Sequence, residues 1–196
     1  MSTPPATPHP VHRGTLLIRG GRLIDPAQGV DRIDDLLIRD GRVVAGGAHG
    51  GSADETLDAT GMIVVGHGVD LIEVARIERM LQEHGERFSE RVFTATERAY
   101  ASAGGRRTAE RFAARFAAKE AAMKAIGTGW RSGIAWTDAE VVHGADGAPM
   151  LHVHGQLAAH AAALGIDLWR ITITHTDHLA MASVLAGRAD RSAAPR

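Results

Sequence analysis

The order of the predicted elements indicates an α+β fold: an antiparallel or mixed sheet packed against a long helix, preceded by a short β-rich extension. Three observations lead to this prediction. The first part of the chain holds short β-rich runs broken by Gly-Gly, Asp-Gly and Pro-Ala pairs. The stretch 111–129 has the apolar spacing of one long amphipathic helix. Around this helix, the remaining segments follow the order strand, helices, hairpin, helix, hairpin.

Composition limits the classes of function. The 196 residues suffice for one domain with an appendage, and 44% of them are hydrophobic, which allows a core. With 22 basic and 23 acidic residues the formal charge is -1, which argues against a nucleic-acid-binding protein. There is no cysteine, no apolar run of membrane-spanning length and no signal-peptide pattern. We therefore expect a cytoplasmic protein that contacts neither nucleic acid nor membrane.

Residues 1–61 form two segments of different character. We expect a disordered, proline-rich tail at 1–14 and a β-rich segment at 15–61, with a hairpin turn at Arg39–Arg42. The runs LLIRGGRLID, DLLIRDGRVVAGG and ETLDATGMIV resemble the N-terminal strands of dihydroorotase-like amidohydrolases. In that family a metal-binding His-x-His and a barrel follow. Here the place is taken by Gly66-His67-Gly68 and no barrel follows, so the resemblance does not extend to hydrolase chemistry.

A strand is predicted at Met62–Val69, ended by Asp70, and a helix at Glu73–Gly85. Asp70 with Glu73 three residues later fits a capping box, which gives Asp70 a purely structural interpretation. The other predicted elements are two short helices within Phe88–Ser102 with a turn at Thr94, strands at Ile134–His143, Met150–Val153, Trp169–Thr174 and Leu179–Leu185, a helix at Gln156–Leu164, and a disordered tail from 188 to 196.

The long helix carries the residues with chemical potential. Lys119 and Glu120 lie at the flanks of its apolar stripe, where a carboxylate loses water and needs a hydrogen bond, a cation or a metal. With Lys124 and the following turn 127–129, they are what a metal-assisted phosphate site needs, because glycines let backbone approach a phosphate. The alternative is an ordinary solvated helix in which Glu120 and Lys124 are an i,i+4 pair and Gly127 is a C-cap.

Three segments carry a second resemblance. RFAAKEAAMKAIGTG, MIVVGHGVDLIEV and ITITHTDHLAMASV resemble the signatures of the holo-acyl-carrier-protein synthases, the small 4'-phosphopantetheinyl transferases. They occur in family order with family-like spacing, and the resembling region runs from 62 to 187. The resemblance implies the fold of that family. It also implies Mg²⁺-dependent transfer of 4'-phosphopantetheine from coenzyme A to a serine of an acyl carrier protein, as in fatty acid biosynthesis.

The resemblance also implies roles for single residues. Asp70 and Glu120 match magnesium ligands and, with Lys119, form the expected catalytic set; either carboxylate could be the general base. Residues expected to bind coenzyme A are Lys124, Gly127, Thr128, Gly129, His175 and Thr176, although the last two also suit a plain polar turn.

Partners follow from the same resemblance. The carrier protein is acidic, so Arg76 and Arg79 are the expected docking residues. A homotrimer is the expected assembly. The remaining alternative to an enzyme is a non-catalytic module that binds the carrier protein.

Overall fold

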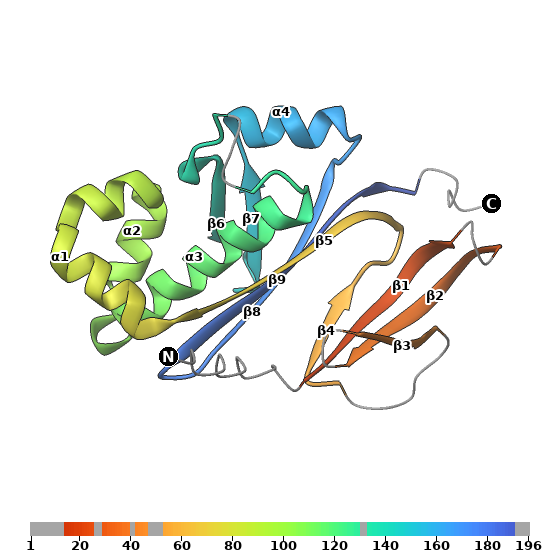
Figure 1. Cartoon of the computed structure of the whole chain (residues 1–196), viewed down its shortest axis with the longest axis horizontal. Coiled ribbons are helices and arrows are strands. Elements are labelled where there is room, and N and C mark those ends of the chain that lie inside the picture. Colours follow the sequence, from red (N-terminus) through yellow and green to blue (C-terminus); the bar gives the residue numbers. More distant parts are fainter. Residues whose placement is uncertain (1–13, 26–28, 40–41, 47–52, 130–132, 191–196) are drawn as a thin grey trace, which may run out of the picture. The chain divides into compact units, whose positions relative to one another are not determined.

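The computed structural model describes residues 14–25, 29–39, 42–46, 53–129 and 133–190 (Figure 1). Most of the two tails predicted to be disordered, and the Asp40-Gly41 turn, lie outside these ranges. The chain divides into two compact units, residues 1–60 and 61–196, which are described separately. No helix in the described ranges is long and apolar enough to cross a membrane.

The first unit is a small β-structure. Strand β1 (Thr15–Asp25) pairs antiparallel with β2 (Val30–Arg39), and β2 pairs antiparallel with β3 (Arg42–Gly46). Strand β4 (Glu55–Asp58) pairs parallel with β1. Arg39 lies opposite Arg42, so the predicted hairpin is confirmed for its strands.

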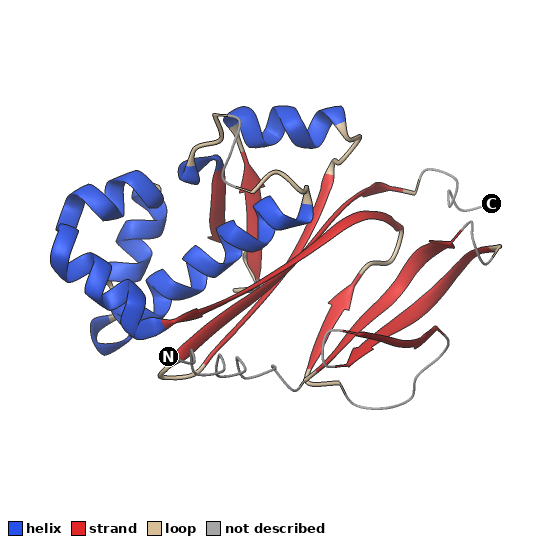
Figure 2. Ribbon diagram, viewed as in Figure 1, coloured by secondary structure: helices blue, strands red, loops and turns tan. Residues whose placement is uncertain are grey.

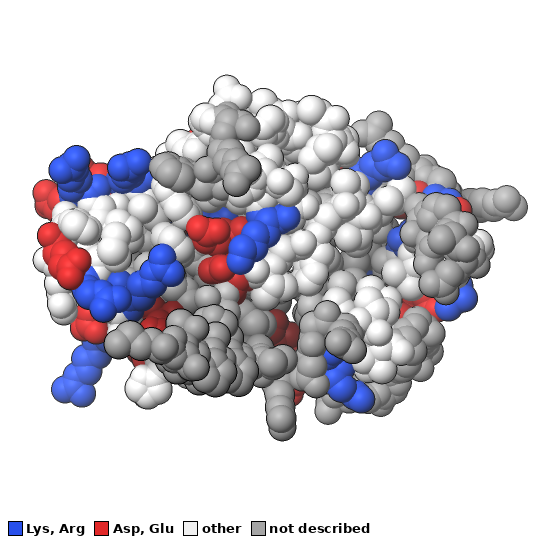
Figure 3. Space-filling model, in the orientation of Figure 1, with Lys and Arg blue, Asp and Glu red and all other residues white. Residues whose placement is uncertain are grey.

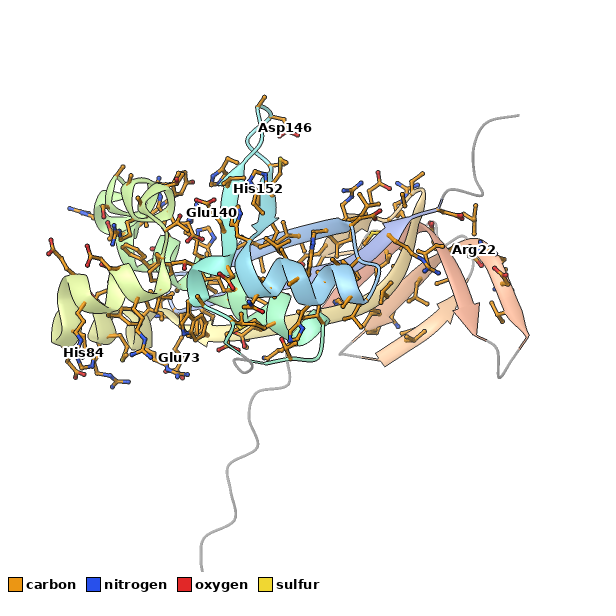
Figure 4. All side chains as sticks on the ribbon, turned by 90° about the horizontal axis from the view of Figure 1, so that it is seen from above. Arg22, Glu73, His84, Glu140, Asp146 and His152 are labelled. Atoms are coloured by element: carbon orange, nitrogen blue, oxygen red, sulfur yellow. The ribbon has the colours of Figure 1, made fainter. Side chains whose placement is uncertain are left out.

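The second unit combines antiparallel strands with helices (Figures 1 and 2). Strand β9 (Leu179–Ala189) lies between β5 (Met62–Glu73) and β8 (Leu168–His175). A separate hairpin joins β6 (Ala139–His143) to β7 (Pro149–Val153), with Asp146 at its tip (Figure 4). The helices are α1 (Val74–Val92), α2 (Ala95–Ser102), α3 (Thr108–Ala125) and α4 (Gly155–Ala163), with 3-10 turns η1 (Gly105–Arg107) and η2 (Trp136–Asp138). The α+β prediction is confirmed.

Helix α3 packs directly on the backbone of β5 and β9. Its buried residues are largely alanines, whose short side chains let the helix approach the sheet closely. On β5, a Cβ at Gly66 would overlap the carbonyl oxygen of Ala125, and one at Gly68 would overlap that of Ala121. Alanine against glycine therefore sets an unusually close distance between the helix and the strand that carry the site.

The N-terminal end of α1 differs from the prediction. Strand β5 does not end at Asp70 but continues to Glu73, because Asp70 and Glu73 remain paired with Ala182 and Leu179 of β9. Glu73, at the junction with α1 (Figure 4), is the N-cap and makes no side-chain capping bond. The predicted Asp70–Glu73 capping box is therefore wrong, and the Asp70 carboxylate is left for another role.

Two further predictions have opposite outcomes. The turn at Thr94 is confirmed, since Thr94 caps α2 in a capping box with Glu97. The strand predicted at Ile134–His143 is wrong in its first half, where the chain forms η2. The Asp138 carboxylate explains the difference, because it accepts hydrogen bonds from the amides of Ala135 and of Gln156 in the first turn of α4.

Candidate active site

Asp70 and Lys124 join β5 to α3. The Lys124 Nζ atom lies 2.7 Å from Asp70 Oδ1 and donates a second hydrogen bond to the Val69 carbonyl at 3.1 Å. The Asp70 side chain is only 15% exposed, whereas that of Lys124 is 48% exposed. A largely buried carboxylate thus holds a cation whose other side is open to solvent.

Glu120 lies one helical turn before Lys124 and is half-buried. Burial raises the pKa of its carboxyl group, and the negative charge of Asp70 raises it further, while Lys124 and Arg76 act in the opposite direction. Glu120 therefore shares one electrostatic environment with Asp70, Lys124 and Arg76. We call these four residues the carboxylate cluster.

The carboxylate cluster offers two possible protein ligands for a magnesium ion, Asp70 and Glu120. The two acids disfavour each other's ionisation, which a divalent cation would relieve. Among the described residues there is no group of three or more His, Asp or Glu side chains that could hold a metal by themselves. Two carboxylates completed by phosphate oxygens and water are a set that magnesium commonly takes. Asp70 and Glu120 thus fit a magnesium ion shared with a phosphate-bearing substrate.

The structure does not bring Lys119 to this cluster, contrary to the prediction. Its side chain is fully buried, and its Nζ lies 2.7 Å from Glu97 Oε2 and 3.1 Å from the Trp136 carbonyl oxygen, with a further bond to the Ala139 carbonyl. All three ammonium donors are used, so none is left for a substrate. A helical wheel cannot find this partner, because Glu97 belongs to another helix. The spacing of Thr94 and Glu97, which fits a capping box, was the available sign in the sequence that Glu97 has a structural role.

The turn after α3 closes the helix. Gly127 and Gly129 adopt left-handed backbone angles, with φ of 72° and 54°. The amides of Gly127 and Thr128 donate to the carbonyls of Lys124 and Met123 at 3.0 and 3.2 Å. These two amides are therefore occupied by the helix end, and the C-cap interpretation of Gly127 holds in this conformation.

The turn between β8 and β9 carries the last predicted site residues. His175 Nε2 lies 3.6 Å from Glu110 Oε2 in the first turn of α3. The Thr176 hydroxyl accepts from the amides of His178 and Leu179 at 3.2 and 3.1 Å, as expected of a polar turn. His175 is exposed at the end of its strand, and the structure gives no contact between it and the carboxylate cluster.

Arg76 and Arg79 lie in the first turns of α1, and both are exposed. Arg76 is close enough to Glu120 to lower its pKa, so it connects the surface of α1 with the carboxylate cluster. Basic and acidic side chains both gather over the α1 and α2 end of the second unit (Figure 3).

Comparison with known proteins identifies the family. Residues 66–182 match the family model of the 4'-phosphopantetheinyl transferase superfamily. The chain belongs to this superfamily, and it is therefore a transferase. The match lies entirely within the second unit and includes all four residues of the carboxylate cluster.

Among its relatives are proteins named holo-[acyl-carrier-protein] synthase. That of Solibacter usitatus is 49% identical over 123 residues, covering 63% of this chain and 98% of the relative. That of an Anaeromyxobacter species is 51% identical over 126 residues, covering 63% and 95%.

The chain is also similar to solved structures of proteins with this name. A holo-(acyl-carrier-protein) synthase from Bacillus anthracis in complex with CoA (3',5'-ADP) is 36% identical, with a TM-score of 0.54, and covers 65% of this chain and 99% of that one. The enzyme from Neisseria meningitidis is 29% identical, with a TM-score of 0.58, and covers 63% and 98%.

Proposed function

We propose that the protein transfers the 4'-phosphopantetheine arm of coenzyme A to a serine of an acyl carrier protein. Adenosine 3',5'-bisphosphate is the leaving group. The observation that carries this proposal is the meeting of Asp70, Glu120 and Lys124, which lie in two separate family motifs, on one strand and one helix. The names of the relatives and the CoA complex of the Bacillus anthracis protein support it.

The reaction breaks a bond within a pyrophosphate, so negative charge develops on phosphoryl oxygens. Catalysis of such a transfer consists mainly of positioning and charge stabilisation. The half-exposed ammonium of Lys124 is the cation that would contact these oxygens. Asp70 and Glu120 would together hold a magnesium ion, which supplies further positive charge to the phosphates.

The serine hydroxyl of the carrier protein must lose a proton as it attacks. Glu120, acting through a bound water, is our candidate for the general base, because it is half-buried and lies beside Asp70 and Lys124. Asp70 is the alternative, but its carboxylate is already engaged by Lys124 at 2.7 Å.

The carrier protein would dock on the start of α1. An acidic partner is attracted by exposed guanidinium groups, and Arg76 and Arg79 present two of them. Since Arg76 also acts on Glu120, a partner bound there would bring its serine close to the carboxylate cluster.

We further propose a homotrimer located in the cytoplasm. On the sheet face opposite α3, β5 exposes Val65, Val69 and Leu71 to 45%, 40% and 39%. A row of exposed apolar side chains is typical of a protein interface. Light scattering on the full chain and on a chain that starts at Met62 tests the assembly, and a monomer in both cases would refute it.

For the first unit, we retain the interpretation of residues 15–61 as a fused amidohydrolase-like fragment without hydrolase chemistry. The family match begins at 66, so the proposed activity depends on the second unit alone. A chain that starts at Met62 should therefore keep the activity.

Release of adenosine 3',5'-bisphosphate tests the proposed function. The full chain, coenzyme A and an apo acyl carrier protein should release it with magnesium and not with EDTA. Binding of the carrier protein without nucleotide release would instead favour a non-catalytic carrier-binding module.

A further inference from the structure

A buried ion pair lies directly beside the active-site residue Glu120. Lys119 and Glu97 are both fully buried, with Nζ and Oε2 2.7 Å apart. Burial lowers the pKa of Lys119, while the charge of Glu97 raises it. No step of the proposed reaction uses either side chain.

The pair ties three elements together. The Glu97 carboxylate accepts from the Thr94 amide at the start of α2 and from the Val141 amide in β6, both at 2.9 Å. Lys119 donates to the carbonyls of Trp136 and Ala139, on either side of the turn that leads into β6. Every donor and acceptor of the pair therefore has a partner, and all contacts converge on a single position of α3.

Such a pair contributes little net stability, because the cost of removing two charges from water offsets their attraction. Its contacts are directional, however, whereas apolar packing is not. The packing of α3 on β5 offers few interlocking side chains, since alanines such as Ala121 and Ala125 meet Gly66 and Gly68. Close packing of this kind fixes the distance between helix and strand but only weakly opposes sliding or rotation of the helix.

We propose that Lys119 and Glu97 are positioning residues that fix the rotation and axial register of α3. They thereby hold Glu120 and Lys124 in place over Asp70. The inference rests on the proposed function. Through Glu97, helix α2 would support the site, although α2 contributes no residue to the carboxylate cluster itself.

The test is the double variant Lys119→Met/Glu97→Gln, which removes both charges and leaves neither unpaired. Val141→Ala is the matched control, because it damages the same core and leaves the pair intact. We measure Tm, kcat at saturating substrates and KM for coenzyme A, for these and the wild-type chain. We expect Val141→Ala to lose up to about 10 °C in Tm, and the double variant to lose no more than this control, because the pair contributes little net stability. Only the double variant should lose kcat, by at least about tenfold, with KM for coenzyme A changed less than about threefold.

Each outcome is informative. A double variant with wild-type kcat, beside an active wild-type chain, overturns the positioning role alone. A double variant that does not fold also overturns it, because the pair would then serve stability. Glu97→Asp, which draws the carboxylate back and preserves the charges, should show the same loss of kcat as the double variant. A wild-type chain that transfers nothing overturns the proposed function, and the positioning role with it.

Discussion

The contact between α3 and β5 can be tested at a single atom. In Gly68→Ala, the new Cβ would overlap the Ala121 carbonyl oxygen and would lie 2.6 Å from the Ala125 amide nitrogen. Ordinary contacts of a Cβ atom begin at 3.4 Å, and both neighbours are backbone atoms that cannot rotate away. The helix must therefore move from the strand by about 1 Å, and overpacking of this kind costs about 1–3 kcal/mol.

Two consequences follow from this displacement. We expect the upper end of that range, which for a chain of this size lowers Tm by about 6–12 °C. Because Glu120 and Lys124 move with α3 and Asp70 stays on β5, kcat should fall by about a hundredfold, as expected for a displacement of about 1 Å.

The assay compares thermal unfolding by circular dichroism with kcat of the folded enzyme at 25 °C. Val64→Ala is the control, because it shortens a side chain on the same strand and should leave kcat unchanged. If Gly68→Ala keeps both the Tm and the kcat of the wild type, α3 does not lie against β5 as described.

Three further predictions concern charge. Lys119→Ala alone leaves the Glu97 carboxylate buried and unpaired, which should cost about 3–5 kcal/mol in urea unfolding, and a cost under about 1 kcal/mol would contradict the ion pair. Because the pKa of Glu120 is raised in the folded state, the folded chain binds this proton more tightly, and the wild type loses stability as pH rises above about 4. Glu120→Gln should therefore raise the free energy of unfolding at pH 7, by less than about 1 kcal/mol because the group is partly exposed, and should have no effect near pH 3; an equal effect at both pH values would contradict the shift. Arg76→Glu should raise KM for the carrier protein about tenfold, or about 1.4 kcal/mol, and spare KM for coenzyme A. Arg87→Glu, further along α1, is its control, and an unchanged carrier-protein KM in Arg76→Glu would refute docking there.

Local patterns in the sequence predicted most of the fold. The turn at Thr94, the β6–β7 hairpin and the long helix are each determined by neighbouring residues, and the structure has all three. Asp70 with Glu73 offered an equally good local pattern, yet it failed because pairing with β9 extends the strand beyond it. Local signals therefore fail where a distant strand competes for the same backbone.

The site was predictable only in part for the same reason. Resemblance to a family led to Asp70 and Glu120, which lie far apart in the sequence and are brought together by the fold. Lys119 lies next to Glu120 and has the same kind of side chain as Lys124, so the sequence cannot tell the two lysines apart. The difference comes from Glu97, whose carboxylate holds Lys119 in the core, while Lys124 remains half-exposed beside Asp70.

The most direct test of the account is the intact mass of an apo acyl carrier protein after incubation with this chain, coenzyme A and magnesium. We predict a gain of one phosphopantetheine per carrier serine, absent with EDTA and with the Glu120→Ala variant. No gain with the full chain, and none with a chain that starts at Met62, would contradict the transferase account. A gain that persists in Glu120→Ala would contradict the role of the carboxylate cluster.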